Sequence, residues 1–269
     1  MRVMPKEPAT EQWQPTPLAP FGVVATSGTP GADPETIPVP LLREWVSAHR
    51  VVVLRGFAPL PGDSFPDFCS RLGPILEWDF GAVNDLRARP AARNYIYTNH
   101  AVPFHWDGAF AGRVPHYIIF QCDAAPPPGA GGETLFCDTT RLRARARPDQ
   151  QTRWGRVAIT YTTEKIAHYG GSFTAPLLAH HPVSNEPTVR FAEPVNDLNP
   201  LHLEIAGLPA DAHADFLREL GELLYAPAVC YAHAWQSGDL LVADNHALLH
   251  GRRAYAEGTP RRLRRVNIL

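Results

Sequence analysis

The chain has 269 residues, 45% of them hydrophobic, and 25 Lys and Arg against 27 Asp and Glu give a formal net charge of -2. This length fits one large β domain or two modest ones, and the apolar fraction is ordinary for a globular protein with a sizeable core. The near-neutral charge, with no long basic run before the final residues, argues against a nucleic-acid partner. No apolar run reaches the ~20 residues that a membrane span needs, so no membrane association is expected.

The chain starts with polar and proline-rich sequence where a secretory signal would place an apolar stretch. The four cysteines are widely spaced without a C-x-x-C pair, which indicates neither a zinc knuckle nor a disulfide framework. We therefore expect a cytoplasmic location. The 28 prolines and 20 glycines are typical of many strands joined by irregular loops.

The first expected elements follow a polar, proline-rich segment over residues 1–20, which predicts a flexible N-terminal arm ahead of a single domain over 21–269. Residues 40–46 have the spacing of a short amphipathic helix, and the continuous apolar run at 51–57 predicts a buried strand. A second helix is expected over 63–72, with Asp63 as its N-cap.

The middle of the chain predicts strands at 95–97, 117–122 and 132–137. Asp138 is then placed to cap a short helix that carries several arginines. The pattern over 150–205 predicts little beyond short strands around 157–162 and 189–191.

The last third begins with the most regular helix of the chain. Apolar residues recur at helical spacing from Phe216 to Leu224, and strand-like segments follow at 229–234, 238–244 and 262–269. Neither a repeat nor a low-complexity linker interrupts this order. We predict a mainly β domain with flanking helices and a double-stranded β-helix (jelly-roll) core.

His105-Trp106-Asp107 is the segment that points most directly to chemistry. In a strand, residues i and i+2 project from the same face, so His105 and Asp107 can bind one cation while Trp106 points the other way. Taken alone, H-x-D occurs often by chance. Its apolar and small neighbours, however, would leave two polar groups without partners unless a cation binds between them.

His250 is the candidate for a second histidine ligand, since it follows a predicted strand and turn. Two histidines and one carboxylate on one side of a metal leave coordination positions open, as in non-haem Fe(II) oxygenases. A hydrogen-bonded core histidine is the simpler alternative. His246 competes for the role, and His246 with His250 could form a helical zinc pair, but the adjacent glutamate of metalloproteases is missing and Asp244-Asn245 favours a turn.

Arginines alternate in the final predicted strand, where Arg261 and Arg265 would share a face. A solvated basic edge that resists aggregation is the alternative, and it suits Arg262 and Arg264. Burying the first pair would be costly without anionic partners. A dicarboxylate supplies one such partner, and an acidic substrate supplies another.

Together these motifs resemble the TauD/TfdA family of Fe(II)/2-oxoglutarate dioxygenases, whose pattern is an H-x-D strand, a G-G-[DE]-T segment and a W-x-x-G-D…D-N…H…R-x-x-x-R tail. The matching residues are His105-Trp106-Asp107, Gly131-Gly132-Glu133-Thr134, Trp235 to Asp239, Asp244-Asn245, His250, Arg261 and Arg265, with Val53-Leu54-Arg55-Gly56-Phe57 near the start. The likeness covers residues 38–269 and is weakest over 150–205.

The resemblance implies that His105, Asp107 and His250 bind iron, that Thr134 and Arg261 hold the distal carboxylate of 2-oxoglutarate, and that Arg265 lies close to the substrate. It implies an enzyme that uses Fe(II), 2-oxoglutarate and O2 to remove hydrogen from an unactivated C–H bond. Asp107 matters for the outcome, because related halogenases replace this carboxylate with a small residue. Hydroxylation or desaturation is therefore expected.

The substrate is expected to be a small acidic molecule, with Tyr97, Phe104 and Phe110 as walls of its pocket. The His105-Trp106-Asp107-Gly108 segment and compact tail are similar to family members that act on amino-acid derivatives in secondary metabolism, including isonitrile pathways. A taurine- or aryloxy-acid-type substrate, or a peptide or protein, remains open.

Two further classes stay open as alternatives. A cupin-like zinc hydrolase would use the same three ligands without 2-oxoglutarate, and a non-catalytic binding barrel would tolerate the loss of Asp107. The run Gly129-Ala130-Gly131-Gly132 is no phosphate loop, because no Lys-Ser/Thr follows it. A homo-oligomer is compatible with the sequence.

Overall fold

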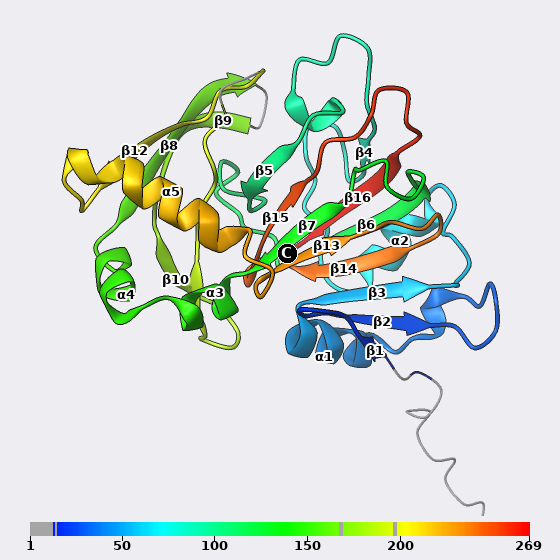
Figure 1. Cartoon of the computed structure of the whole chain (residues 1–269). Helices are drawn as coiled ribbons and strands as arrows, with labels where there is room; N and C mark the ends of the chain where they lie inside the picture. The colour runs from blue at the N-terminus through cyan, green and yellow to red at the C-terminus, as the bar shows by residue number, and fades with distance from the viewer. Residues whose placement is uncertain (1–12, 14, 167–168, 196–197) are drawn as a thin grey trace, which may run out of the picture.

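The computed structural model describes residue 13 and residues 15–166, 169–195 and 198–269. Two sheets lie face to face at its centre (Figure 1). The larger has the order β1-β2-β3-β14-β6-β16-β4 and is antiparallel except for β2 with β3. The smaller has the order β13-β7-β15-β5. The predicted jelly-roll architecture is therefore confirmed.

The strands of the larger sheet are β1 (Thr16–Pro17), β2 (Val23–Thr26), β3 (Val51–Arg55), β4 (Asn84–Leu86), β6 (Tyr117–Ala124), β14 (Leu240–Asp244) and β16 (Arg262–Ile268). Those of the smaller sheet are β5 (Val102–His105), β7 (Thr134–Asp138), β13 (Cys230–His233) and β15 (Leu248–Arg252). The inner faces meet in a core that includes Phe120 and Leu263 from one sheet and Phe136 and Leu248 from the other.

Alternation along each strand decides which side chains enter the space between the sheets. Leu263 of β16 lies in that inner core, so Arg265 two residues on shares its face. Leu248 of β15 lies there too, and His250 follows it at the same spacing. The strand period therefore directs the candidate site residues inward.

Helices cover the outer face of the larger sheet. In α1 (Val39–His49) and α2 (Ser64–Ser70), the buried residues pack with the outward side chains of β3 and β16. Arg55 fixes β3 to β14 through a two-pronged ion pair with Asp239, at 2.8 and 2.7 Å. Asp239 also contacts His233 at 3.2 Å. The Arg-Gly-Phe and Gly-Asp motifs thus serve the scaffold.

A separate lobe flanks the smaller sheet (Figure 1). It contains α3 (Thr139–Arg145), α4 (Pro148–Trp154), α5 (His213–Leu224), a three-stranded sheet of β8 (Ala158–Ile166), β9 (Tyr169–Pro176) and β12 (His202–Ala206), and the pair β10 (Leu178–His180) with β11 (Pro187–Val189). A large apolar cluster around Trp154, Tyr161 and Phe216 fills it. This lobe contains most of the region that the sequence pattern left undefined.

Local predictions differ in their outcome. Asp138 caps α3 as predicted, accepting hydrogen bonds from two backbone N–H groups of the first turn. Asp63 precedes α2, but its side chain makes no capping hydrogen bond with the described residues. The strand predicted at 95–97 is wrong: Tyr95–Tyr97 is a single 3-10 turn whose start is fixed by the Asn94 side chain. β-propensity of tyrosine and isoleucine yields here to a local side-chain cap.

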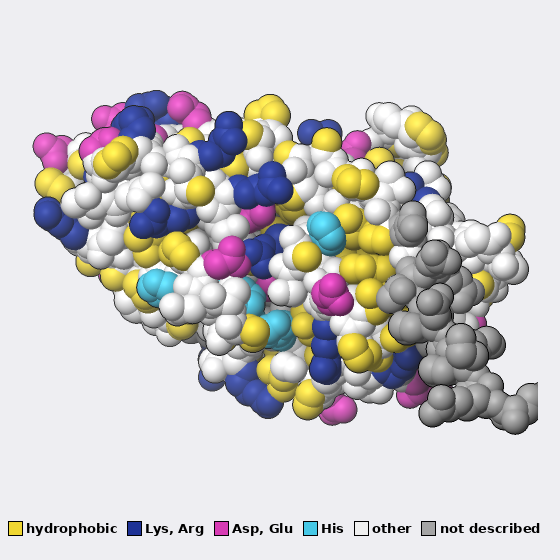
Figure 2. All heavy atoms as spheres, turned by 90° about the horizontal axis from the view of Figure 1, so that it is seen from below, with side chains coloured by type: hydrophobic (Ala, Val, Ile, Leu, Met, Phe, Trp, Pro, Cys, Tyr) yellow, Lys and Arg dark blue, Asp and Glu magenta, His cyan; other side chains and the backbone are white. Residues whose placement is uncertain are grey.

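The predicted N-terminal arm lies mostly outside the described residues. Of its described part, Trp13 is 5% exposed and packs against Phe57, and β1 pairs with β2. The division into an arm and one domain stays a prediction. Among the described helices, none is long and apolar enough to cross a membrane. On the face in Figure 2, acidic and basic side chains are interspersed, in keeping with the small net charge.

Candidate active site

His105, Asp107 and His250 converge between the two sheets. His105 ends β5 and is the direct cross-strand partner of His250 in β15, so their ring centroids lie 4.2 Å apart. One ligand atom from each of the three residues lies within 4.8 Å of the others. Asp107 Oδ1 is 3.9 Å from His105 Nε2 and 3.8 Å from His250 Nε2.

The strand argument for H-x-D is only partly right. β5 ends at His105, and Asp107 belongs to the turn that follows. Trp106 does point away, into the core of the lobe, where its ring meets Tyr161. The position of Asp107 is set instead by Asn245, which accepts from its N–H at 3.0 Å and donates to its C=O at 3.1 Å.

Neighbouring groups orient the three candidate ligands. His105 Nδ1 lies 2.9 Å from the Pro103 carbonyl, which leaves Nε2 with a free lone pair toward Asp107. His250 Nε2 is buried and has no hydrogen-bond partner among the described residues. Asn267 Nδ2 donates to Asp107 Oδ2 at 2.9 Å, and Arg265 Nη1 lies 3.0 Å from the same oxygen.

The pKa values of the three groups suit metal binding. Burial alone would raise the pKa of Asp107, but Arg265, the two imidazoles and Asn267 outweigh it and lower the pKa to about 2. Burial lowers the pKa of His105 and, with His105 as a cationic neighbour, lowers that of His250 further. An ionised carboxylate beside two neutral imidazoles is the protonation state that a divalent cation requires.

The donor set fits Fe(II). Two imidazoles and one carboxylate leave coordination positions for an oxidisable co-substrate, and the unpaired Nε2 of His250 is a buried acceptor that a cation would satisfy. His105, Asp107 and His250 would hold the ion.

Thr134, the first residue of β7, and Arg261, which directly precedes β16, form a second polar group. Arg261 Nε donates to the Gly132 carbonyl at 2.8 Å, and Nη2 reaches Thr134 Oγ1 at 3.4 Å. Arg261 is 6% exposed, and its Nη1 has no partner in the described part of the chain. Burial and the nearby Arg252 lower the pKa of Arg261 to about 9. A buried guanidinium in this state favours binding of a carboxylate.

Gly132 is required for this arrangement. Its φ is +80°, and a Cβ there would lie 3.0 Å from Arg261 Cδ. Trp235 also belongs to this group, although no role was assigned to it from the sequence: its indole N–H donates to Thr134 Oγ1 at 3.0 Å. The hydroxyl proton of Thr134 is thereby left to donate to a ligand.

A cavity of about 410 Å³ is lined by His105 and Asp107 and extends to residues of the lobe such as Tyr169 and Glu193. Of the predicted substrate residues, Arg265, Tyr97, Phe104 and Phe110 all line it. Phe104 is 1% exposed and packs against Tyr225, so it also belongs to the core.

The sequence missed other lining residues, which include Asn84, Tyr95, Glu164, Tyr169, Glu193 and Asn199. Four of these six come from the region 150–205, whose sequence carries no recognisable motif. Tyr95 and Tyr169 interact through their side chains. Burial, together with the negative charge of Asp107, raises the pKa of both hydroxyls.

His246 is not part of this cluster. It lies in the turn between β14 and β15, where Arg190 donates to its Nδ1 at 2.8 Å. Asp244 Oδ1 accepts from its backbone N–H at 2.9 Å. The helical zinc pair with His250 is therefore excluded, because the two residues are separated by a turn and the start of a strand.

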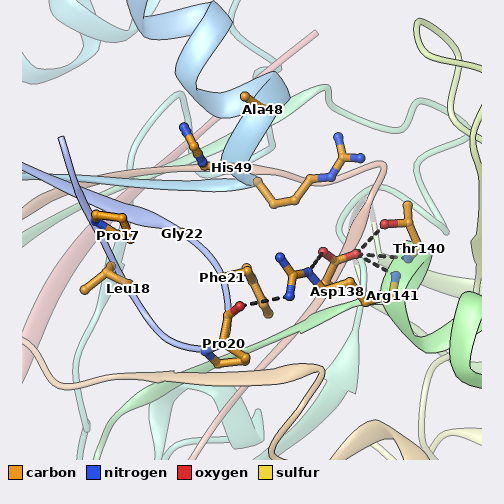
Figure 3. Close-up of a pocket in the computed structure, with 11 residues that line it drawn as sticks. Pro17, Leu18, Pro20, Phe21, Gly22, Ala48, His49, Asp138, Thr140 and Arg141 are labelled. Atoms are coloured by element: carbon orange, nitrogen blue, oxygen red, sulfur yellow. Dashed lines mark hydrogen bonds and ion pairs between the residues drawn. The ribbon is translucent and has the colours of Figure 1, made fainter. Parts of the chain in front are cut away.

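A second hollow, of about 340 Å³, lies between the β1–β2 connection, the end of α1 and the start of α3 (Figure 3). Its main charged groups already have partners: Arg141 donates to the Pro20 carbonyl and pairs with Asp138. Arg50 pairs with Glu186. These contacts indicate a structural junction.

The "Taurine catabolism dioxygenase TauD, TfdA family" model matches residues 14–267. The chain is 46% identical over 256 residues to a 3-((Z)-2-isocyanoethenyl)-1H-indole synthase of Fischerella ambigua, covering 94% of each chain. It is 35% identical to a tyrosine isonitrile desaturase of Pseudomonas aeruginosa, covering 92% of this chain and 87% of the relative.

Among solved structures, PvcB, described as an Fe, alpha-ketoglutarate dependent oxygenase from an isonitrile synthetic pathway, matches with a TM-score of 0.82 and 32% identity. The match covers 99% of this chain and 95% of that one. AAD-2 in complex with Mn(II) and N-oxalylglycine matches with a TM-score of 0.73 at 17% identity, which supports the fold alone.

Proposed function

Because the chain belongs to the TauD/TfdA family of Fe(II)- and 2-oxoglutarate-dependent dioxygenases, we propose that it desaturates an isonitrile derived from an aromatic amino acid. This substrate is a small carboxylic acid of secondary metabolism. The similarity to an isocyanoethenyl-indole synthase favours the tryptophan derivative over the tyrosine derivative, because that relative is the more similar of the two.

Bound Fe(II), 2-oxoglutarate and O2 supply the oxidant, with succinate and CO2 as co-products. His105, Asp107 and His250 would hold the iron, and Thr134 and Arg261 the distal carboxylate of 2-oxoglutarate. The chain positions the substrate carbon and keeps water from the site. The Cα–Cβ bond becomes a double bond as the substrate loses two electrons. The substrate also loses two protons if its carboxylate stays, or one proton and CO2 if its carboxylate leaves. The second outcome is implied by the isocyanoethenyl group in the name of the Fischerella ambigua relative.

The observation that carries the substrate proposal is a cavity with aromatic walls that ends at a cation. Tyr95, Phe110 and Tyr169 line it, and Arg265 lies in its wall beside the ligand Asp107. Its volume is within the range of small-molecule sites. Aromatic side chains suit an indole or phenol ring, while Arg265 suits the carboxylate.

The test uses the purified full-length chain under anaerobic conditions. Addition of Fe(II) and 2-oxoglutarate should give the weak visible charge-transfer band of the chelate. The isonitrile of tryptophan is then added with O2, and mass spectrometry should show the alkene together with one succinate per turnover.

Two results would contradict the proposal separately. Absence of the band in folded protein would refute the assignment of His105, Asp107, His250, Thr134 and Arg261 to Fe(II) and 2-oxoglutarate binding. Formation of the band with turnover of taurine or an aryloxy acid, but not of the isonitrile, would overturn the substrate.

A further inference from the structure

Asn84 is a buried amide in the cavity wall with an unused donor. The residue is 3% exposed, and its Oδ1 accepts from the Tyr97 hydroxyl at 3.0 Å. Its Nδ2 is buried without a hydrogen-bond partner in the residues described. Buried amides are nearly always satisfied, because an unpaired one has lost its hydrogen bonds to water for nothing in return. A free N–H at a cavity wall therefore points to a ligand that accepts from it.

Asn84 lies directly opposite Arg265. The two are Cα partners in β4 and β16, so their side chains leave the same face with Cβ atoms about 4.5–5.5 Å apart. Arg265 gives Nη1 to Asp107 at 3.0 Å, yet its buried Nε is unpaired with any described residue. The wall beside the metal ligand thus carries two unused N–H donors, one cationic and one neutral.

This pair of donors matches a carboxylate. A carboxylate presents two oxygens, and both accept hydrogen bonds most strongly when the acceptor is ionised. Asp107 neutralises Arg265 only in part once it also shares its charge with a metal ion. A second anion at this wall would therefore meet net positive potential together with a directed neutral donor.

We propose that Asn84 is a second anchor for the substrate carboxylate, with Nδ2 donating to one oxygen while Arg265 binds the other. The inference rests on the proposed function, since it requires a substrate with a free carboxylate. Contact at both oxygens fixes the rotation of the carboxylate as well as its place. Asn84 therefore contributes to substrate affinity and not to the chemical step.

The experiment compares the isonitrile of tryptophan with its methyl ester, which lacks the anionic oxygen pair. Wild type, Asn84→Leu and Asn84→Asp are measured with both compounds for kcat and KM. Substrate binding is measured separately by calorimetry without O2, in the presence of Fe(II) and 2-oxoglutarate. Asp85→Asn is the matched control, because Asp85 lies next along β4 and pairs with Arg262 on the exposed side.

Asn84→Leu should raise the KM and the anaerobic Kd of the acid about tenfold to a hundredfold, the usual effect of losing a hydrogen bond to a charged group, with little change in kcat. For the ester, the KM and Kd of Asn84→Leu should differ from those of wild type by less than about threefold. Asn84→Asp, which is nearly isosteric and places a like charge against the substrate carboxylate, should raise the KM and the Kd of the acid further. Asp85→Asn should match wild type.

Equal losses for acid and ester, or an unchanged Kd of the acid in Asn84→Asp, would overturn the anchor. The isosteric Asp variant keeps this test decisive if Asn84→Leu does not fold. Failure of wild type to turn over the isonitrile would refute the proposed function and the anchor with it. Normal wild-type turnover with unaffected variants would refute the anchor alone.

Discussion

Asn245 should control metal affinity without touching the metal. Its side chain is 1% exposed and makes three hydrogen bonds: it accepts from Asp107 N–H at 3.0 Å and donates to the carbonyls of Asp107 and Pro115 at 3.1 and 2.9 Å. Asn245→Ala leaves all three backbone groups buried and unpaired. The turn after β5, which positions the Asp107 carboxylate, then loses both hydrogen bonds between the Asn245 side chain and the Asp107 backbone.

The magnitude follows from those three groups. Each unsatisfied buried polar group costs roughly 1–3 kcal/mol, and water in the space left by the side chain relieves part of this. We expect Asn245→Ala to lower the free energy of unfolding by about 3 kcal/mol. Loss of a group that orients a metal ligand typically weakens metal affinity about 10- to 100-fold.

Urea denaturation and anaerobic calorimetry with Fe(II) measure the two effects. Thr139→Val is the control. The Thr139 hydroxyl donates at 2.7 Å to the carbonyl of Ala247, which lies with Asn245 in the turn between β14 and β15, but it makes no hydrogen bond to Asp107. It should cost about 1 kcal/mol of stability and leave metal affinity unchanged. Wild-type Fe(II) affinity in folded Asn245→Ala would refute the reasoning.

Three more outcomes are expected. Arg261→Lys should raise the concentration of 2-oxoglutarate needed for the visible chelate band about 10-fold or more, because lysine cannot reproduce a two-pronged contact; an unchanged titration would contradict the assignment. Asp107→Ala should weaken Fe(II) binding and the chelate band while the chain stays folded by circular dichroism, because only the two imidazoles of the donor set remain; Fe(II) affinity equal to that of wild type would place the metal elsewhere. Burial opposes the ionised form of Asp239, but Arg55 and His233 outweigh it and lower its pKa below 3.8. The carboxylate is therefore more acidic in the folded than in the unfolded state, so its contribution is present above 3.8 and is lost as pH falls through the lower folded pKa. Between the unfolded and the folded pKa, the free energy of unfolding of Asp239→Asn, measured by urea denaturation, should fall less steeply with decreasing pH than that of wild type. Equal slopes would argue against the ion pair.

Motif residues were predictable because their chemistry depends on residue type. Two histidines and a carboxylate with a downstream arginine indicate a metal and an acidic co-substrate wherever they occur in the fold. Apolar runs and strand alternation likewise predicted β3, β6, β14 and β16, since their side chains are sorted by burial on each face.

The substrate wall could not be predicted in this way. Asn84, Tyr169 and Asn199 come from segments far apart in sequence, and neither spacing nor local propensity distinguishes them from other polar residues. Tyr95–Tyr97 reads as a strand locally, yet its turn follows from a cap by Asn94. The placement of Asn84, Tyr169 and Asn199 depends on contacts between remote segments, which local patterns do not encode, whereas the turn at Tyr95–Tyr97 depends on a local cap that β-propensity does not take into account.

The sequence by itself determined the reaction chemistry, because His105, Asp107, His250 and Arg261 are defined by what their side chains can bind. The tertiary structure decided how they meet: cross-strand pairing brings the two imidazoles together, and Asn245 holds the carboxylate after β5 has ended. It also decided that Asn84 lies opposite Arg265, because strand register is a property of the whole sheet.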